Sequence, residues 1–167
     1  DYIVEKKSRY EMWWVFGWPY ETSVAMGRLV FSGLFDAYPN LKIITHHMGA
    51  MVPYFEGRVG AGLDQLGART PDADRGLVAH NLKKRPIDYF RMFYADTALF
   101  GAVAPLECGL AFFGLDHVLF GTDMPFDPEK GPGFIRETIR AVEAMSIAPQ
   151  DRATIYEGNA RRLLKLS

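Results

Sequence analysis

The stretch Val118-Leu119-Phe120-Gly121-Thr122-Asp123 decides the fold class of this chain. It is a short apolar run that ends in polar residues, which is typical of a buried strand. Residues 41–46 and 92–97 have the same character and also end in polar residues. The sequence therefore predicts three strands with polar tips, over residues 41–46, 92–97 and 116–121.

Helical segments precede, separate and follow these strands. Apolar residues at helical spacing, or helix-opening prolines, predict helices over residues 21–35, 54–66, 82–90, 103–113, 134–145, 149–156 and 157–166. Thr22 is the predicted N-cap of the first helix, and residues 13–18 indicate either a short strand or an aromatic loop. Strands separated by helices are parallel and joined by crossovers. The predicted class is α/β, as one domain over residues 1–167, and a doubly wound sheet and a β/α barrel both fit it.

The composition excludes several classes of protein. Of the 167 residues 49% are hydrophobic, and the net charge is −1 at pH 7. This balance favours neither a nucleic acid nor a membrane surface as partner, and no stretch approaches the roughly 20 apolar residues of a membrane span. The single cysteine, Cys108, fits a reducing compartment, so we expect a cytoplasmic protein. Its apolar surroundings in the sequence predict a buried structural thiol rather than a nucleophile.

The polar strand tips form the candidate site. In both folds the active site lies at the edge where the strands end, and this edge receives His46 or His47, Asp96 and Asp123. Such a set can ligate a divalent metal or supply acid and base groups. The alternative is structural: a histidine bonded to a main-chain carbonyl, or an aspartate that caps a turn. Neighbours on a strand point to opposite faces, so at most one histidine is expected to face the site. Asp96 ranks below Asp123.

Three further side chains are candidates for a substrate pocket. Trp18 and Phe126 flank strand ends and suit a flat substrate, and Glu21 opens a helix just past a strand end. A carboxylate favoured by the helix dipole explains Glu21 equally well. Trp13 and Trp14 could line the same pocket, but packing in the core or an interface is the favoured prediction for both. Asp127 is predicted to lie in a loop. The glycine-rich motifs of nucleotide sites and the Gly-x-Ser-x-Gly motif of serine hydrolases are absent from the sequence.

Four stretches of the chain resemble the amidohydrolase-related family. This branch of the amidohydrolase superfamily includes aminocarboxymuconate-semialdehyde decarboxylase and the resorcylate-type decarboxylases. The stretches are Pro19-Tyr20-Glu21-Thr22, Thr45-His46-His47-Met48-Gly49-Ala50 followed by Pro53 and Gly57-Arg58, Gly121-Thr122-Asp123-Met124-Pro125-Phe126, and Gly158-Asn159-Ala160. They cover nearly the whole chain, and the Gly-Thr-Asp-x-Pro-Phe stretch is the most specific of them.

The resemblance implies a (β/α)8 TIM barrel with a divalent metal, zinc or manganese, at its carboxyl face. In this family an aspartate on the eighth strand is a metal ligand and a histidine on the sixth strand is catalytic, and these match Asp123 and His47. The other family ligands are histidines on earlier strands, yet no histidine precedes His46. A full barrel also takes about 250 residues. We therefore expect the C-terminal portion of a barrel, about three strands with an open edge, and the first five strands outside this chain.

The same resemblance implies a reaction. It is the metal-dependent, non-oxidative decarboxylation of an aromatic or unsaturated carboxylic acid, with His47 as general acid/base and Asp123 as metal ligand and catalytic carboxylate. Hydrolysis or hydration, such as lactone or amide cleavage, is the alternative on the same fold. A non-catalytic fragment that serves only assembly or binding is another. The expected partners are a small carboxylic acid substrate and further copies of the chain in a homo-oligomer.

Overall fold

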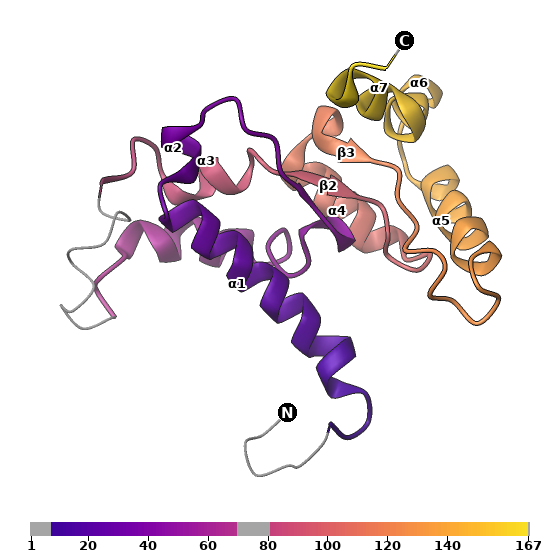
Figure 1. Cartoon of the computed structure of the whole chain (residues 1–167), viewed down its shortest axis with the longest axis horizontal. Coiled ribbons are helices and arrows are strands. Elements are labelled where there is room, and N and C mark those ends of the chain that lie inside the picture. Colours follow the sequence, from indigo (N-terminus) through magenta and orange to yellow (C-terminus); the bar gives the residue numbers. More distant parts are fainter. Residues whose placement is uncertain (1–7, 70–80, 167) are drawn as a thin grey trace.

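A small parallel sheet lies at the centre of the molecule. The computed structural model describes residues 8–69 and 81–166. Its three strands are β1 (Ile44–Thr45), β2 (Tyr94–Asp96) and β3 (Val118–Leu119), paired in parallel in the order β1-β2-β3. The prediction of three parallel strands is confirmed, and all three carboxyl ends lie at the same edge of the sheet (Figure 1).

Each strand is shorter than its predicted run. The ladder pairs Ile44 with Tyr94, and Asp96 with Leu119. Residues beyond these pairs bond elsewhere: the main-chain N–H of Phe120, inside the predicted strand, donates to the carbonyl of Ile155 at 3.0 Å. Apolar patterning reports burial, and burial extends further along the chain than strand pairing does.

Helices occupy the segments between and after the strands. They are α1 (Trp18–Phe31), α2 (Leu34–Ala37), α3 (Pro86–Phe90), α4 (Val103–Phe113), α5 (Pro132–Ala144), α6 (Pro149–Ala153) and α7 (Asn159–Leu164). Irregular helical turns add η1 (Trp13–Gly17), η2 (His47–Gly49), η3 (Arg58–Gly62), η4 (Leu63–Gln65), η7 (Leu115–His117) and η8 (Thr154–Gly158). Four helices, α1, α3, α5 and α6, have proline in their first two positions, where its fixed φ fits and no N–H is needed.

The N-terminal segment differs from its prediction. Residues 13–17 form the π-helical η1 and run directly into α1, so neither a strand nor a loop is present. Aromatic residues favour strands only where cross-strand neighbours cover them, and Trp14 remains exposed here. Thr22 consequently lies inside α1 and is not its N-cap. Gly33, with φ 74°, separates α1 from α2 and divides the predicted helix of residues 21–35.

The segment predicted as a helix over residues 54–66 is irregular. It contains the π-helical η3 and the short η4 in place of a continuous α-helix. Gly57, Gly60 and Gly62 supply no side chains to pack and cost more backbone entropy than other residues in a regular helix.

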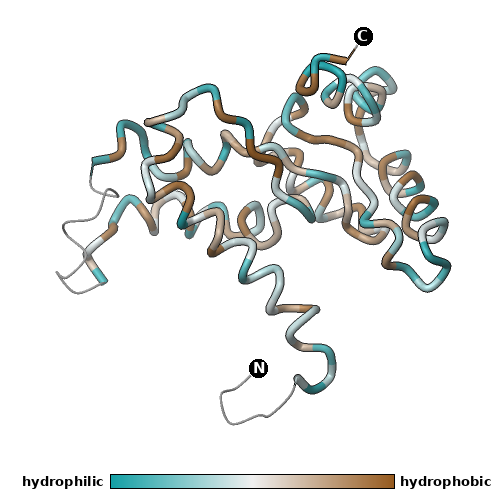
Figure 2. Tube along the Cα trace, in the orientation of Figure 1, coloured by the Kyte–Doolittle hydropathy of each residue, from teal (hydrophilic) through white to brown (hydrophobic). Residues whose placement is uncertain are grey.

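One hydrophobic core joins the sheet to its helices. Phe93, Ala95 and Val118 from the strand region are fully buried, together with Leu106 of α4 and Ile155 of η8. Figure 2 shows the strands as hydrophobic segments at the centre of the trace. In Figure 1, α1 extends away from this core, and α7 lies beside β3. Among the described residues no helix is long and apolar enough to cross a membrane.

Candidate active site

The tip of β1 is a tight left-handed turn. His47, Met48, Gly49 and Ala50 have φ angles of 50°, 52°, 72° and 55°. Only glycine adopts positive φ without cost, so the three non-glycine residues of this turn need support from their surroundings. The turn takes the chain sharply away from the strand direction immediately after His46.

His47 is held at two points. Its main-chain N–H donates to Oδ1 of Asp96 at 2.9 Å, and its ring Nδ1 lies 2.6 Å from the carbonyl oxygen of Ala98. A carbonyl oxygen only accepts, so Nδ1 carries the proton in this contact. In the neutral ring Nε2 is then the unprotonated nitrogen, and Nε2 has no partner among the described residues.

His46 lies next to His47 rather than on the opposite face. The two rings are 4.8 Å apart and nearly perpendicular, and Nε2 of His46 lies 3.3 Å from Oγ1 of Thr22 on α1. The prediction of opposite faces is wrong because β1 ends at Thr45 and strand alternation stops there. His46 is therefore an exposed neighbour that contacts a helix.

Asp96 connects the tips of β1 and β2. Its Oδ1 accepts from the main-chain N–H of His47 and, at 3.0 Å, from that of Ala98. Burial raises the pKa of Asp96, and the two N–H groups and the charge of His47 oppose that rise. Asp96 thus caps a turn, as one sequence interpretation held. Asp96 also contacts His47, a predicted catalytic residue. The sequence analysis ranked Asp96 below Asp123 and did not anticipate this contact.

Asp123 stands on the extension of β3. Its φ is 63°, a conformation that aspartate tolerates better than most residues, and it is half-buried. Thr97 Oγ1 fixes the preceding residues by donating to the carbonyl of Gly121 at 2.9 Å and accepting its N–H at 3.1 Å. The carboxylate of Asp123 makes no hydrogen bond within residues 8–69 and 81–166, which leaves both oxygens available.

The loop that carries Asp123 is anchored by Asp127. This side chain is only 5% exposed, and its Oδ1 accepts from the N–H groups of Glu129 at 2.8 Å and Gly133 at 3.2 Å. Burial acts to raise the pKa of Asp127, but the main-chain N–H groups outweigh burial and hold that pKa below its ordinary value. Asp127 does lie in the predicted loop, and there it joins the loop to the start of α5.

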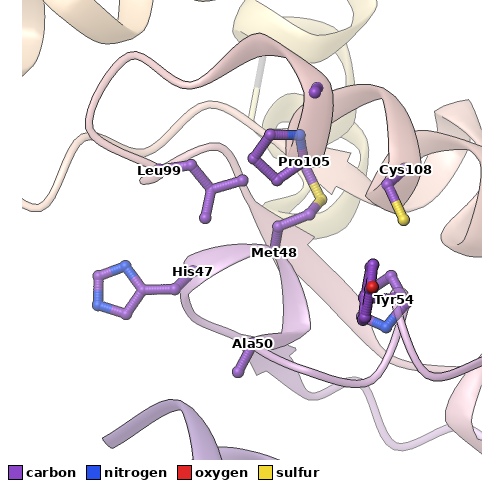
Figure 3. A pocket seen from close by; sticks show the side chains of 9 residues that line it. His47, Met48, Ala50, Tyr54, Leu99, Pro105 and Cys108 are labelled. Atoms are coloured by element: carbon purple, nitrogen blue, oxygen red, sulfur yellow. The ribbon is translucent and has the colours of Figure 1, made fainter. Parts of the chain in front are cut away.

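An apolar pocket of about 270 Å³ adjoins His47. Figure 3 shows the His47 ring at one end of it and Tyr54 and Cys108 at the other. Cys108 is half-buried, so the prediction of a buried thiol is wrong. The reason is that it borders this pocket, which the apolar run around it did not indicate. Neither Asp123 nor any of the predicted pocket residues lines this pocket.

The three predicted pocket residues lie elsewhere on the surface. Trp18 is exposed and packs its ring edge-on against Trp13 at 4.8 Å. Phe126 is largely exposed, two residues beyond Met124 in the loop that Asp123 begins. Glu21 is exposed in the first turn of α1, where the helix dipole favours it. Their contact with a substrate remains a prediction.

One aromatic residue near His47 escaped the sequence interpretation. The ring of Phe100 lies 5.5 Å from that of His47, 4.7 Å from Phe134 on α5, and 6.1 Å from Trp14. Trp14 is 41% exposed in this group, so it does not pack in the core, and its packing in an interface stays a prediction. An aromatic residue four positions after the polar tip of β2 was the available signal.

A metal site is incomplete in this part of the chain. Among residues 8–69 and 81–166 no group of three or more histidine, cysteine, aspartate or glutamate side chains could hold an ion. A structural or catalytic metal usually takes at least three protein ligands. The described residues alone therefore do not fit a divalent metal, and Asp123 can supply only part of such a site.

Three comparisons with known proteins agree on a family. The family model described as Amidohydrolase matches residues 8–166. A gamma-resorcylate decarboxylase from Polaromonas sp. (strain JS666 / ATCC BAA-500) is 36% identical over 155 residues, covering 92% of this chain and 43% of that protein. A 2-keto-4-carboxy-3-hexenedioate hydratase from Sphingobium sp. (strain NBRC 103272 / SYK-6) is 29% identical over 146 residues, covering 84% of this chain and 38% of the hydratase.

A solved structure shows the same likeness. The dihydroxybenzoic acid decarboxylase from Polaromonas sp. JS666, with bound manganese and the inhibitor 2-nitroresorcinol, matches with a TM-score of 0.74 and 32% sequence identity. The match covers 94% of this chain and 44% of that one. This chain thus spans less than half the length of the relatives it matches, and its predicted fold, the C-terminal part of a barrel, is confirmed. By the match over residues 8–166, the chain belongs to the amidohydrolase family.

Proposed function

We propose that this chain is the C-terminal portion of a metal-dependent, non-oxidative decarboxylase of an aromatic or unsaturated carboxylic acid. One observation carries the proposal. At the carboxyl edge of the sheet, the Nε2 atom of His47 and the carboxylate of Asp123 have no partner among the described residues. In parallel α/β folds that edge is where ligands bind.

The chemistry needs a proton donor. Decarboxylation breaks the bond between a ring or alkene carbon and its carboxylate, carbon dioxide leaves, and a C–H bond forms in place of the lost bond. In its protonated form His47 can donate from Nε2 while Nδ1 stays bonded to the carbonyl of Ala98. Phe100 covers one side of the same ring and offers an apolar surface to an aromatic substrate.

The metal is proposed for the larger protein only. A related structure contains manganese, and we propose manganese or zinc held in part by Asp123, with the remaining ligands outside the described residues. The chain by itself is then expected to bind manganese or zinc at well below one ion per chain. Elemental analysis after dialysis measures this, and a stoichiometric ion would contradict an incomplete site.

The architecture of the larger protein follows from the same comparison. We propose that residues 1–167 form one unit, that five further strands complete the barrel, and that the protein assembles from identical copies. The substrate is proposed to be a small carboxylic acid, because the related decarboxylases act on molecules of that kind.

Product analysis tests the reaction. The longer protein containing this sequence is assayed for carbon dioxide released from 2,6-dihydroxybenzoate and other aromatic acids, with lactones, amides and unsaturated keto acids in parallel. His47→Gln and Asp123→Asn are each expected to lower kcat by about 100-fold or more. Asp116→Asn, an exposed aspartate at the opposite end of β3, is the control and should leave kcat unchanged.

The outcomes separate the alternatives. A hydrolysis or hydration product without carbon dioxide would favour the hydratase-like function, which the related hydratase makes the second candidate. No turnover of any substrate, combined with stable assembly, would favour a fragment that serves only binding. Carbon dioxide release that survives both substitutions would remove His47 and Asp123 from the mechanism.

A further inference from the structure

We infer that Asp96 is the positioning residue of this site, which fixes both the backbone turn and the ring tautomer of His47. The inference deepens the proposed function, and its consequence for catalysis rests on that function. Its structural part, the control of His47, stands independently of any activity.

A single oxygen atom of Asp96 controls His47 in two ways. Directly, Oδ1 accepts the main-chain N–H of His47 at 2.9 Å. Indirectly, the same Oδ1 accepts the N–H of Ala98 at 3.0 Å, and the carbonyl of Ala98 then faces Nδ1 of His47 at 2.6 Å. The three contacts close a ring between the tips of β1 and β2. Because a carbonyl oxygen can only accept a hydrogen bond, this closed set of contacts selects the tautomer of His47 with the proton on Nδ1.

The turn that follows β1 needs this support. His47, Met48 and Ala50 all have positive φ angles, a conformation that persists only where surrounding contacts over-determine it. A carboxylate that accepts a main-chain N–H forms a charge-assisted hydrogen bond, stronger than one between neutral groups. Asp96 provides that bond at the first residue of the turn.

The third strand tip holds Asp96 in place. A Cβ atom added to Gly121 would lie 2.9 Å from Cβ of Asp96, closer than such atoms approach. Thr97, the next residue, bonds both main-chain groups of Gly121. The segment leading to Asp123 therefore packs directly on Asp96, so the same side chain contacts the turn that carries His47 and the segment that leads to Asp123.

The direct test is the tautomer of His47. Ring ¹⁵N chemical shifts are measured by NMR in the 167-residue chain and in Asp96→Asn and Asp96→Ala, with His47→Gln used to assign the signals. The chain and Asp96→Asn, whose amide oxygen still accepts, are expected to show mainly the Nδ1–H form. Asp96→Ala is expected to show a mixture of both forms. A folded Asp96→Ala with the unchanged single tautomer would overturn the inference.

A second variant covers the case in which Asp96→Ala does not fold by circular dichroism. Gly121→Ala keeps the carboxylate and pushes it away through the added Cβ. It is expected to give the same mixture of tautomers, and an unchanged single tautomer in this folded variant would overturn the inference equally. Asp116→Ala is the matched control, because it removes an exposed aspartate at the other end of the sheet and should change nothing at His47.

Kinetics of the longer protein separate this inference from the proposed function. Asp96→Ala is expected to lower kcat by about 100-fold through misplacement of His47, with little change in KM, and Asp96→Asn is expected to recover most of the loss. An active enzyme whose kcat is unchanged by Asp96→Ala would contradict the positioning role of Asp96 in catalysis. An unsubstituted protein that releases no carbon dioxide would refute the proposed function and leave the NMR result standing.

Discussion

The two edges of the sheet differ in how their backbone groups are satisfied. At the β3 edge, the N–H of Phe120 donates to Ile155, and Nδ2 of Asn159 donates to the carbonyls of Leu115 at 2.7 Å and Val118 at 2.6 Å. At the β1 edge, the strand pairs only with β2 among the described residues, and Ile44 is 49% exposed.

This difference shows which edge the chain completes by itself. The C-terminal η8 and α7 satisfy β3 with their own groups, and Asn159 is fully buried in doing so. An unpaired strand with an exposed apolar side chain is a template for another strand. The strand that precedes β1 in a barrel is therefore expected beside it, on the side where residues 8–69 and 81–166 offer nothing to cover it.

Removing the buried amide at the β3 edge should have the largest effect. Asn159→Ala leaves the carbonyls of Leu115 and Val118 without their donor, and each buried unsatisfied group costs about 1–3 kcal/mol. We expect the free energy of unfolding, measured in urea, to fall by about 3 kcal/mol. Asn40→Ala, at an exposed asparagine, is the control. Equal, small effects of both substitutions would show that Asn159 does not close the edge.

A charge on the β1 edge should act on association rather than on folding. Ile44→Lys places a lysine on an open strand, a device that blocks edge-to-edge pairing. The change in unfolding free energy is expected to stay within about 0.5 kcal/mol, because the side chain is half exposed. Sedimentation velocity of the 167-residue chain should show less concentration-dependent association.

The control for the open edge is Leu164→Lys. Leu164 is also an exposed apolar residue, but it lies on α7, beside the edge that is already closed. The Leu164→Lys substitution should leave the association of the chain unchanged. If both substitutions reduce association equally, general surface hydrophobicity explains the effect, and the contrast between the edges is lost.

The smallest expected effects are on folding stability, and they depend on pH. One is lost in strong alkali and the other in acid. Near β3, burial and a 2.9 Å hydrogen bond to Glu143 raise the pKa of Tyr156 to about 12. A raised folded pKa means stabilisation that is present below the ordinary pKa and is lost as pH rises through about 12. The stability difference between the chain and Tyr156→Phe should be below about 1 kcal/mol, because the side chain is partly exposed, and should vanish in strong alkali.

On the β1 side, folding stability should show the reverse dependence on pH. The hydroxyl of Tyr89 donates to Asp36 at 2.7 Å and holds the pKa of that carboxyl below its ordinary value of 3.8. A lowered folded pKa means stabilisation that is present above 3.8 and is lost as pH falls through the folded value. Tyr89→Phe should therefore lose stability relative to the chain at neutral pH, with the difference shrinking in acid. Urea unfolding across a pH series measures both variants, and a difference that does not change with pH would contradict these assignments.

Much of the architecture was predictable because it depends on local pattern. The apolar runs around residues 92–97 and 116–121 indicated parallel strands, and the rule that parallel strands end at one edge placed Asp96 and Asp123 together. The helix over residues 103–113 matches α4 at both ends. The prediction for residues 13–18 was wrong because aromatic content does not distinguish an exposed helix from a strand.

The site was predictable only in part. His47 and Asp123 were selected by their position at strand tips and by a family resemblance, and their roles remain proposals. Phe100 had only its place four residues after the tip of β2 as a signal, and the anchoring by Asp127 had none. Their significance comes from contacts with residues that other elements supply.

The sequence by itself determined the family, the order of strands and helices, and the edge at which polar residues gather, because hydrophobic periodicity and motif spacing are properties of neighbouring residues. Only the tertiary structure decided that Asp96 bonds His47 across 49 positions of the chain, and that Asn159 bonds backbone groups at one edge while β1, among the described residues, pairs only with β2. Such contacts join residues far apart in the chain. They depend on where the turns direct each backbone N–H and C=O, and no local pattern encodes that.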